Sequence, residues 1–148
     1  MPQAAAVRRP RTLKRVARKR HPFSPPPAPN HNTIAVGMRA FFAIMEKWGL
    51  TYDEASTLLG QPGKTTFYDW KKGEIRNVVH GMDLASRISY VLGIFKSLEI
   101  IYEQPDLADA WVRKPNTVFG GQSALDRMLA GQIVDLARVR EYLDSVRS

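Results

Sequence analysis

Hydrophobic residues recur every three or four positions along most of the chain after residue 30, which is the spacing of helices that bury one face. One such stretch covers residues 33–48, with apolar positions at Ile34, Met38, Phe41, Phe42, Met45 and Trp48. A wider apolar stripe over residues 84–101 predicts a helix buried on more than one side, and a third stretch runs from residue 132 towards 146. Because no window alternates with period two, we predict an all-α fold.

Two short helices separated by a tight turn are predicted between residues 51 and 73. Thr51 with Glu54 three positions later forms a capping box that opens a helix over residues 52–59. A turn with the sequence Gln-Pro-Gly follows, and a second helix over residues 64–72 ends at Gly73, with Phe67 and Trp70 facing inward. A capped helix, a glycine-containing turn and a second short helix form the layout of a helix-turn-helix.

In a helix-turn-helix the second helix lies in the major groove with its N-terminal residues at the base edges. This layout predicts that the DNA-contacting residues are Lys64, Thr65, Thr66 and Tyr68, with Lys71 and Lys72 placed for phosphates. A plain helical hairpin packed against a neighbouring helix is the alternative interpretation of the same segment.

Other chemistries are poorly supported by the sequence. The Gly-Lys-Thr at residues 63–65 resembles the end of a nucleotide-binding loop, but only two residues separate Gly60 from Gly63, where that motif needs four. The three histidines have no metal-site spacing, and the absence of cysteine excludes disulfides, zinc-cysteine sites and thiol catalysis. We therefore expect no cofactor, no metal site and no enzymatic activity.

Positive charge is concentrated at the N-terminus. The 148 residues carry 22 Lys+Arg and 14 Asp+Glu, and eight of the basic but none of the acidic residues lie in residues 1–29. Seven of the ten prolines lie there as well. We expect residues 1–32 to form a disordered, basic, proline-rich tail, which either binds a polyanion such as the DNA backbone or serves only as a solubilising extension.

No apolar run is long enough to span a bilayer, and no apolar segment follows the basic start as a secretory signal would require. A soluble, cytoplasmic protein is expected from these absences. An organelle transit peptide is the alternative for the arginine-rich N-terminus.

The C-terminal third carries the most specific motif, the run Pro-Asn-x-x-Phe-Gly-Gly-x-Ser-Ala-Leu-Asp-Arg-Met-Leu-Ala-Gly at residues 115–131. Its two consecutive glycines allow positive φ, Asn116 can cap its own loop, and Ser123 can cap a short helix over residues 124–130. With Trp111 before it and a last helix after it, this segment resembles the Xre/MbcA/ParS antitoxin family. The resemblance covers roughly residues 35–148.

The resemblance implies a binding protein with two helical parts. Residues 33–104 would form an Xre-like helix-turn-helix domain that dimerises and contacts operator DNA, and residues 105–148 a small toxin-binding domain. The partner would be a RES-domain toxin, which resembles ADP-ribosyltransferases and consumes NAD. The antitoxin would inhibit this toxin by covering its active site and would regulate its own transcription as a homodimer.

Site residues follow from the same resemblance. The expected docking surface comprises Asn116, Phe119, Gly120, Gly121, Arg127 and Met128. The residues expected closest to the toxin's pocket are Arg138, Tyr142, Arg147 and Ser148. On the last helix we also expect surface ion pairs between Asp135 and Arg138 and between Arg140 and Asp144. A purely structural interpretation remains for individual residues, with Phe119 and Met128 filling the core.

Two further functions remain compatible with the sequence. The first is a stand-alone helix-turn-helix transcriptional regulator whose C-terminal region serves oligomerisation. The second is an RNA-binding or nucleoid-associated protein that binds through its basic tail.

Overall fold

The computed structural model describes residues 30–76, 78 and 81–148, and within these ranges every regular element is helical. The α-helices are α2 (His31–Trp48), α3 (Tyr52–Leu58), α4 (Lys64–Lys72), α5 (Gly81–Ile101), α6 (Pro105–Ala110), α7 (Ala124–Met128) and α8 (Ile133–Arg147). Two 3-10 helices, η1 (Trp111–Arg113) and η2 (Thr117–Phe119), lie between α6 and α7. The predicted all-α fold is confirmed for the described ranges.

The predicted tail falls almost entirely outside the described residues. Residues 1–29 are not described, so the prediction of disorder there stays a prediction. The sequence predicts that the tail extends to residue 32, but residues 30–32 belong to the cap and first turn of α2. Helix α2 starts earlier than its apolar pattern predicted because the Asn30 side chain accepts the Thr33 backbone N–H at 2.8 Å.

The other predicted helix ends are set by local signals. The capping box of α3 is present, since Thr51 Oγ1 accepts the Glu54 N–H at 3.1 Å and Glu54 Oε1 accepts the Thr51 N–H at 2.9 Å. Ser123 and Asp126 form a second capping box at the start of α7. Helix α4 has the predicted bounds, and Gly73 ends it in the left-handed conformation.

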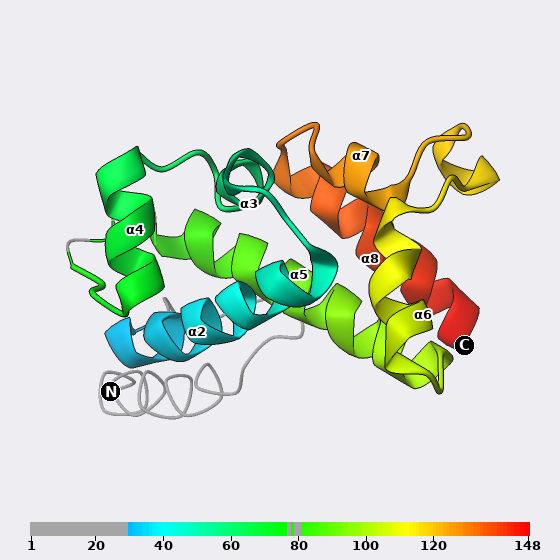
Figure 1. Cartoon of the computed structure of the whole chain (residues 1–148), viewed down its shortest axis with the longest axis horizontal. Helices are drawn as coiled ribbons and strands as arrows, with labels where there is room; N and C mark the ends of the chain where they lie inside the picture. Colours follow the sequence, from blue (N-terminus) through cyan, green and yellow to red (C-terminus); the bar gives the residue numbers. More distant parts are fainter. Residues whose placement is uncertain (1–29, 77, 79–80) are drawn as a thin grey trace, which may run out of the picture.

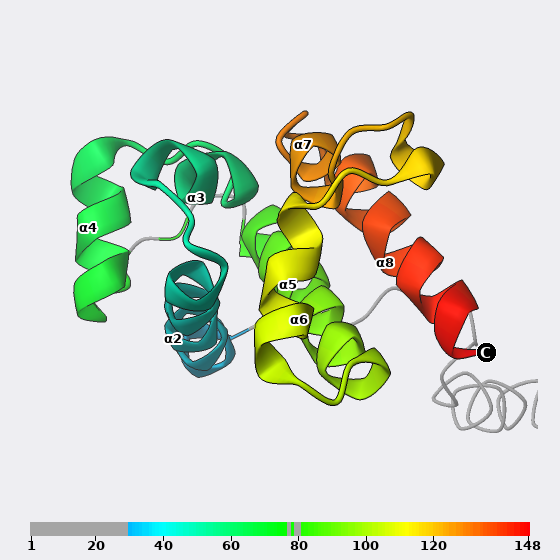
Figure 2. The same cartoon turned by 45° about the vertical axis from the view of Figure 1, so that its right-hand side comes forward.

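Helix α5 runs through the centre of the molecule, with α2 along one side and α8 along the other (Figure 1 and Figure 2). Helices α3 and α4 lie at the α2 side, and α6 and α7 at the α8 side. The largest fully buried side chains include Met38, Phe41, Leu58, Phe67, Val91, Ile94, Leu98, Leu125, Met128, Leu136 and Leu143. These residues form one continuous core, and the predicted burial of α5 on more than one side is confirmed.

Helices α5 and α8 approach each other closely at Gly93. A Cβ atom at this position would collide with the guanidinium of Arg140, which lies across the helix and pairs with Asp144 at 3.1 Å. The glycine therefore allows close helix packing, and the predicted ion pair between Arg140 and Asp144 is confirmed.

The predicted pair between Asp135 and Arg138 is wrong. Asp135 is buried, and its Oδ1 lies 3.2 Å from Nε of Arg127 on α7. Its Oδ2 accepts the Gln132 backbone N–H at 3.1 Å. The carboxylate faces α7 in this position, whereas Arg138 lies exposed on the helix.

Arg113 joins the C-terminal segment to the helix-turn-helix segment. From η1 its guanidinium donates to the backbone carbonyls of Trp48 at 3.2 Å and Gly49 at 2.7 Å, and to Glu54 Oε1 at 2.9 Å. The end of α2, the start of α3 and the C-terminal segment are thus held together at one point. The domain boundary between residues 104 and 105 stays a prediction. Helices from both sides of this boundary pack against α5, namely α2 from the N-terminal side and α6 and α8 from the C-terminal side.

Candidate functional site

The loop between η1 and α7 projects from the C-terminal side of the molecule (Figure 1). Its base is closed by backbone hydrogen bonds from Asn116 N–H to Gln122 O at 2.9 Å and from Gly121 N–H to Asn116 O at 3.0 Å. The Asn116 side chain accepts the Val118 N–H at 3.0 Å, so this residue caps its own loop as predicted. The loop is therefore ordered by its own hydrogen bonds.

Gly120 and Gly121 form the turn of this loop and have φ angles of 69° and 85°. A Cβ atom at either position would meet nothing within 4 Å. The left-handed backbone, and not a lack of space, is therefore what requires glycine here. The predicted positive φ is confirmed.

Three aromatic rings gather beside the loop, and we call Trp111, Phe119 and Tyr142 the aromatic face. The rings of Trp111 and Tyr142 are stacked with centroids 6.2 Å apart, and Phe119 packs edge-on against Tyr142 at 5.7 Å. They come from η1, η2 and α8, and each is half-buried. Half-buried, mutually fixed aromatic rings are typical of protein interfaces.

Helix α8 extends this face. Val134, Arg138 and Tyr142 are four residues apart and therefore share one side of the helix. Val134 is 66% exposed, and Arg138 makes no ion pair among the described residues. On the loop, Val118 is also exposed. Sequence analysis missed Trp111, Val118 and Val134 as site residues; the aromatic residue just before the motif was the available signal for Trp111.

Two predicted docking residues have other surroundings. Met128 is fully buried because α7 turns its apolar side towards η1 and α8, so its placement on an exposed docking surface is wrong. Arg127 is exposed, but its guanidinium holds the Asp135 carboxylate. Both residues therefore hold α7 in the fold. Only Arg127 is also accessible to a partner.

The end of α8 is tied to α5. Arg147 Nη1 donates to the hydroxyl of the buried Ser97 at 3.2 Å, and the Ser148 hydroxyl donates to the Asp144 carbonyl at 2.9 Å. Both terminal residues are exposed, but they lie beyond the aromatic face on the last turn. Of the four residues predicted closest to a toxin pocket, Tyr142 belongs to the aromatic face and Arg138 lies one turn from it.

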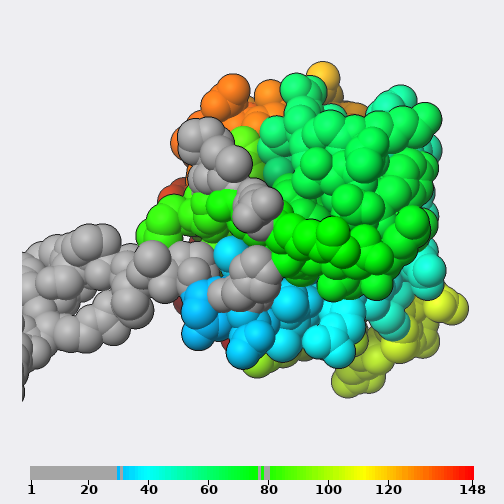
Figure 3. All heavy atoms as spheres, turned by 90° about the vertical axis from the view of Figure 1, so that its left-hand side faces the viewer, coloured from blue at the N-terminus to red at the C-terminus, as the bar shows by residue number. Residues whose placement is uncertain are grey.

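Helix α4 forms the second candidate surface and covers a broad part of one end of the molecule (Figure 3). The predicted DNA-contacting residues are all exposed there, namely Lys64, Thr65, Thr66, Tyr68, Lys71 and Lys72. Phe67 faces inward as predicted and is fully buried, and Trp70 is half-buried. The ring centroids of Phe67 and Tyr52 lie 4.8 Å apart.

Tyr52 orders the exposed start of α4. Its ring is stacked on Tyr68 with centroids 5.7 Å apart, and Lys64 Nζ lies 5.7 Å from the centre of the same ring. Gly63 at the N-cap offers no side chain to the first turn, which leaves backbone N–H groups for an outside acceptor. The sequence predicts Tyr52 only as a residue of α3, because its contact with α4 depends on the turn between the helices.

The pKa of Glu54 is lowered, chiefly by its hydrogen bond with Arg113, while desolvation of the carboxyl opposes this shift. When the pKa of a carboxyl is lower in the folded protein than in the unfolded protein, the ionised carboxylate stabilises the fold at every pH above the unfolded-state pKa. This stabilisation is lost as the pH falls through the folded-state pKa. The junction between α2, α3 and η1 is therefore sensitive to acid.

We expect Glu54→Gln to lower the free energy of unfolding by about 1 kcal/mol at pH 7, because a charged hydrogen bond is replaced by a neutral one. Below the folded pKa of Glu54 the variant and the wild type should be equally stable. Urea unfolding between pH 7 and pH 3 measures this difference. Glu103→Gln, at an exposed carboxyl, is the control; a pH-independent effect of Glu54→Gln would contradict the assignment.

The described residues contain no group of three His, Cys, Asp or Glu side chains placed to hold a metal ion. Among the helices in these ranges, none combines the length and apolarity needed to cross a membrane.

Residues 97–148 match the family model described as the antitoxin Xre/MbcA/ParS C-terminal toxin-binding domain. The uncharacterized protein y4oB of Sinorhizobium fredii (strain NBRC 101917 / NGR234) is similar to the chain, with 41% identity over 121 residues, 82% of this chain and 92% of the relative. The chain belongs to the Xre/MbcA/ParS antitoxin family. The resemblance seen in residues 115–131 is confirmed, and the antitoxin is a member of a toxin-antitoxin system with a toxin as its partner. The aromatic face and the exposed residues of α8 lie entirely within the matched toxin-binding domain of this antitoxin.

Proposed function

We propose that the antitoxin neutralises a RES-domain toxin by laying the aromatic face and the adjoining side of α8 over the toxin's active site. The observation that carries this proposal is the presence of three mutually packed, half-buried rings in a domain of the toxin-binding family. Aromatic side chains of this kind supply most of the binding energy in many interfaces. Exposed Val118 and Val134 enlarge the apolar area around them.

The inhibition we propose is steric and electrostatic, without a reaction catalysed by the antitoxin. RES toxins consume NAD, so their pocket accepts a dinucleotide. Arg138 is exposed beside Tyr142, and its positive charge is available to acidic groups at the rim of such a pocket. The self-closed loop around Asn116 keeps its shape before binding, which lowers the entropy lost on association.

We further propose that α4 binds the operator in the major groove and that the antitoxin acts on DNA as a homodimer. In support, the six polar or charged residues predicted for this role are exposed on one short helix, while Phe67 anchors that helix in the core. A two-fold operator matches a two-fold dimer. The two surfaces lie on different elements, so one protomer can engage toxin and DNA together.

The proposal is tested by expressing the adjacent open reading frame alone and together with the antitoxin. We expect the adjacent product to be a RES-domain protein that lowers cellular NAD and stops growth, and we expect the antitoxin to restore growth and co-purify with it. No association at micromolar concentration would overturn the proposal and favour a stand-alone regulator. Point variants are preferable to truncation because α8 buries Leu136, Val139 and Leu143 in the core.

A further inference from the structure

Arg113 spends most of its hydrogen-bonding capacity on residues of α2 and α3. A guanidinium has five N–H donors, and four hydrogen bonds from Arg113 go to the carbonyls of Trp48 and Gly49 and to both carboxylate oxygens of Glu54. The two carbonyls stand at the C-terminal end of α2, where backbone acceptors lack partners within the helix. The guanidinium is therefore engaged by the antitoxin's own fold, although the Arg113 side chain is 44% exposed.

Arg113 belongs to the same three-residue 3-10 helix, η1, as Trp111 of the aromatic face. The Lys114 N–H donates to the Trp111 carbonyl at 3.1 Å, which closes η1 into a single turn. Val112, between the two residues, is fully buried. In so short an element the backbone moves as one unit, so an anchor at Arg113 fixes the direction in which the Trp111 ring leaves the backbone. The anchor also fixes the first residues of the loop that follows.

Contacts among the three rings hold the aromatic face less firmly than this anchor does. The Trp111 ring lies parallel to Tyr142, with 7° between the ring planes, and meets Phe119 edge-on. Contacts between aromatic rings are individually weak. The contact between Arg113 and Glu54, at 2.9 Å, joins two charged groups and is of the stronger, charge-assisted kind. We therefore expect the orientation of Trp111 to depend on the anchor.

We propose that Arg113 is a positioning residue for toxin binding, which holds the aromatic face in its binding geometry by anchoring η1 to Glu54 of α3. This inference rests on the proposed function of the aromatic face as the docking surface for the toxin. Glu54 and the two carbonyl acceptors lie outside residues 97–148, the range that matches the toxin-binding domain. The helix-turn-helix segment thus contributes to toxin affinity without touching the toxin.

Calorimetry with the purified product of the adjacent open reading frame tests this role. Arg113→Met keeps part of the apolar stem and removes every donor, and we expect toxin binding about tenfold weaker, because the released η1 must be ordered on association. Glu54→Gln keeps an acceptor for the Thr51 N–H but weakens the anchor, and should weaken binding about threefold. In the double variant, Glu54→Gln should add nothing to the effect of Arg113→Met, because the two residues act through one contact.

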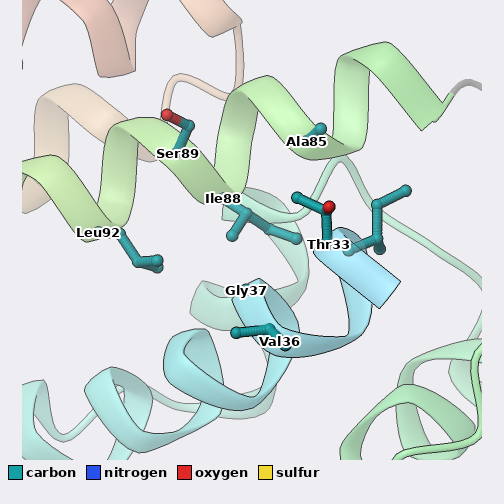
Figure 4. A pocket seen from close by; sticks show the side chains of 8 residues that line it. Thr33, Val36, Gly37, Ala85, Ile88, Ser89 and Leu92 are labelled. Atoms are coloured by element: carbon teal, nitrogen blue, oxygen red, sulfur yellow. The ribbon is translucent and has the colours of Figure 1, made fainter. Parts of the chain in front are cut away.

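Asp83→Asn is the matched control for the loss of an ion pair. Asp83 pairs with Arg87 at 2.9 Å, the distance also found between Arg113 and Glu54, and its side chain is 44% exposed. It lies in the first turn of α5, two residues before Ala85, which lines an apolar groove between α2 and α5 (Figure 4). None of the residues lining this groove belongs to the C-terminal segment. We expect Asp83→Asn to lower stability and to leave toxin affinity unchanged.

The orientation of the Trp111 ring can be followed without toxin. The chain has three tryptophans, so labelling with fluorotryptophan gives three fluorine NMR signals, and Trp111→Phe identifies the signal of the aromatic face. We expect Arg113→Met and Glu54→Gln to shift and broaden this signal, because the ring then samples more orientations. Asp83→Asn should leave it unchanged, which separates loss of positioning from a general loss of stability.

Three results would overturn the inference. If Arg113→Met weakens toxin binding and Glu54→Gln does not, Arg113 contacts the toxin directly. If the two effects multiply in the double variant, the residues act independently of each other. If affinity falls while the Trp111 signal is unchanged, the anchor does not hold the ring.

Phe119→Asp distinguishes a failure of this inference from a failure of the proposed function. If Phe119→Asp weakens toxin binding but Arg113→Met does not, the aromatic face remains the docking surface and only the role of Arg113 is wrong. If Phe119→Asp leaves toxin affinity unchanged in a folded protein, the docking surface lies elsewhere and both proposals are wrong.

Discussion

Phe119→Asp is expected to weaken toxin binding by about 2–4 kcal/mol, or roughly 30-fold to 1000-fold, and to abolish growth rescue. Phe119 lies at the centre of the aromatic face, in contact with the rings of both Trp111 and Tyr142. Aspartate removes the apolar area and places a charge where the toxin would exclude water. Calorimetry with purified toxin measures the affinity, and co-expression measures the rescue.

Two variants make this result interpretable. Phe119→Leu keeps an apolar side chain on the loop and should retain toxin affinity within about tenfold. Tyr68→Ala removes an exposed ring of similar size on α4 and should leave toxin affinity unchanged. Circular dichroism establishes that each variant is folded. A folded Phe119→Asp protein that binds toxin as tightly as the wild type would exclude the aromatic face as the docking surface.

Local signals in the sequence were sufficient to place most helices. Helix α4 was predicted with its observed bounds because glycines stand on both sides of a short stretch with an apolar anchor, Phe67. The capping box of α3 and the Ser123 cap of α7 could be predicted for the same reason, since donor and acceptor lie three positions apart. Patterns of this kind depend on near neighbours, which a single sequence contains in full.

Contacts between distant segments could not be predicted in this way. Arg113 finds its acceptors 59 to 65 positions away, and Arg87 reaches the carbonyl of Leu58 29 positions away. No spacing rule connects such residues. Asp135 shows the same limit, because the local rule paired it with Arg138, whereas the packing of α7 against α8 brings Arg127 closer.

The candidate site was predicted only in part for the same physical reason. The loop glycines and the Asn116 cap are local features and were recognised. The aromatic face assembles from three elements separated by loops, so Trp111 could not be joined to Phe119 and Tyr142 beforehand. The sequence offered burial of Met128 as an alternative, because Leu125 and Met128 are spaced to lie on one apolar side of a helix. A helix of five residues is too short for this spacing to show whether Met128 is buried or exposed.

Thr66→Ala combined with Tyr68→Ala is expected to lower operator affinity by about 2–6 kcal/mol, because each side chain that reads a base edge contributes about 1–3 kcal/mol. Both residues are exposed on α4, and Tyr52 holds the Tyr68 ring in place by stacking. Alanine favours the helix, so the fold should be unaffected. Fluorescence anisotropy with labelled operator DNA measures the loss, and toxin affinity should not change.

Lys64→Gln separates base recognition from attraction to phosphate on the same helix. Lys64 lies at the first position of α4, where a phosphate would also meet the free N–H groups of the first turn. We expect this variant to weaken binding to all DNA sequences alike and to reduce the slope of log K against log salt by about one. The double alanine variant should instead lose preference for the operator at an unchanged slope. If both variants alter only the salt slope, α4 contacts the DNA backbone and some other element reads the bases.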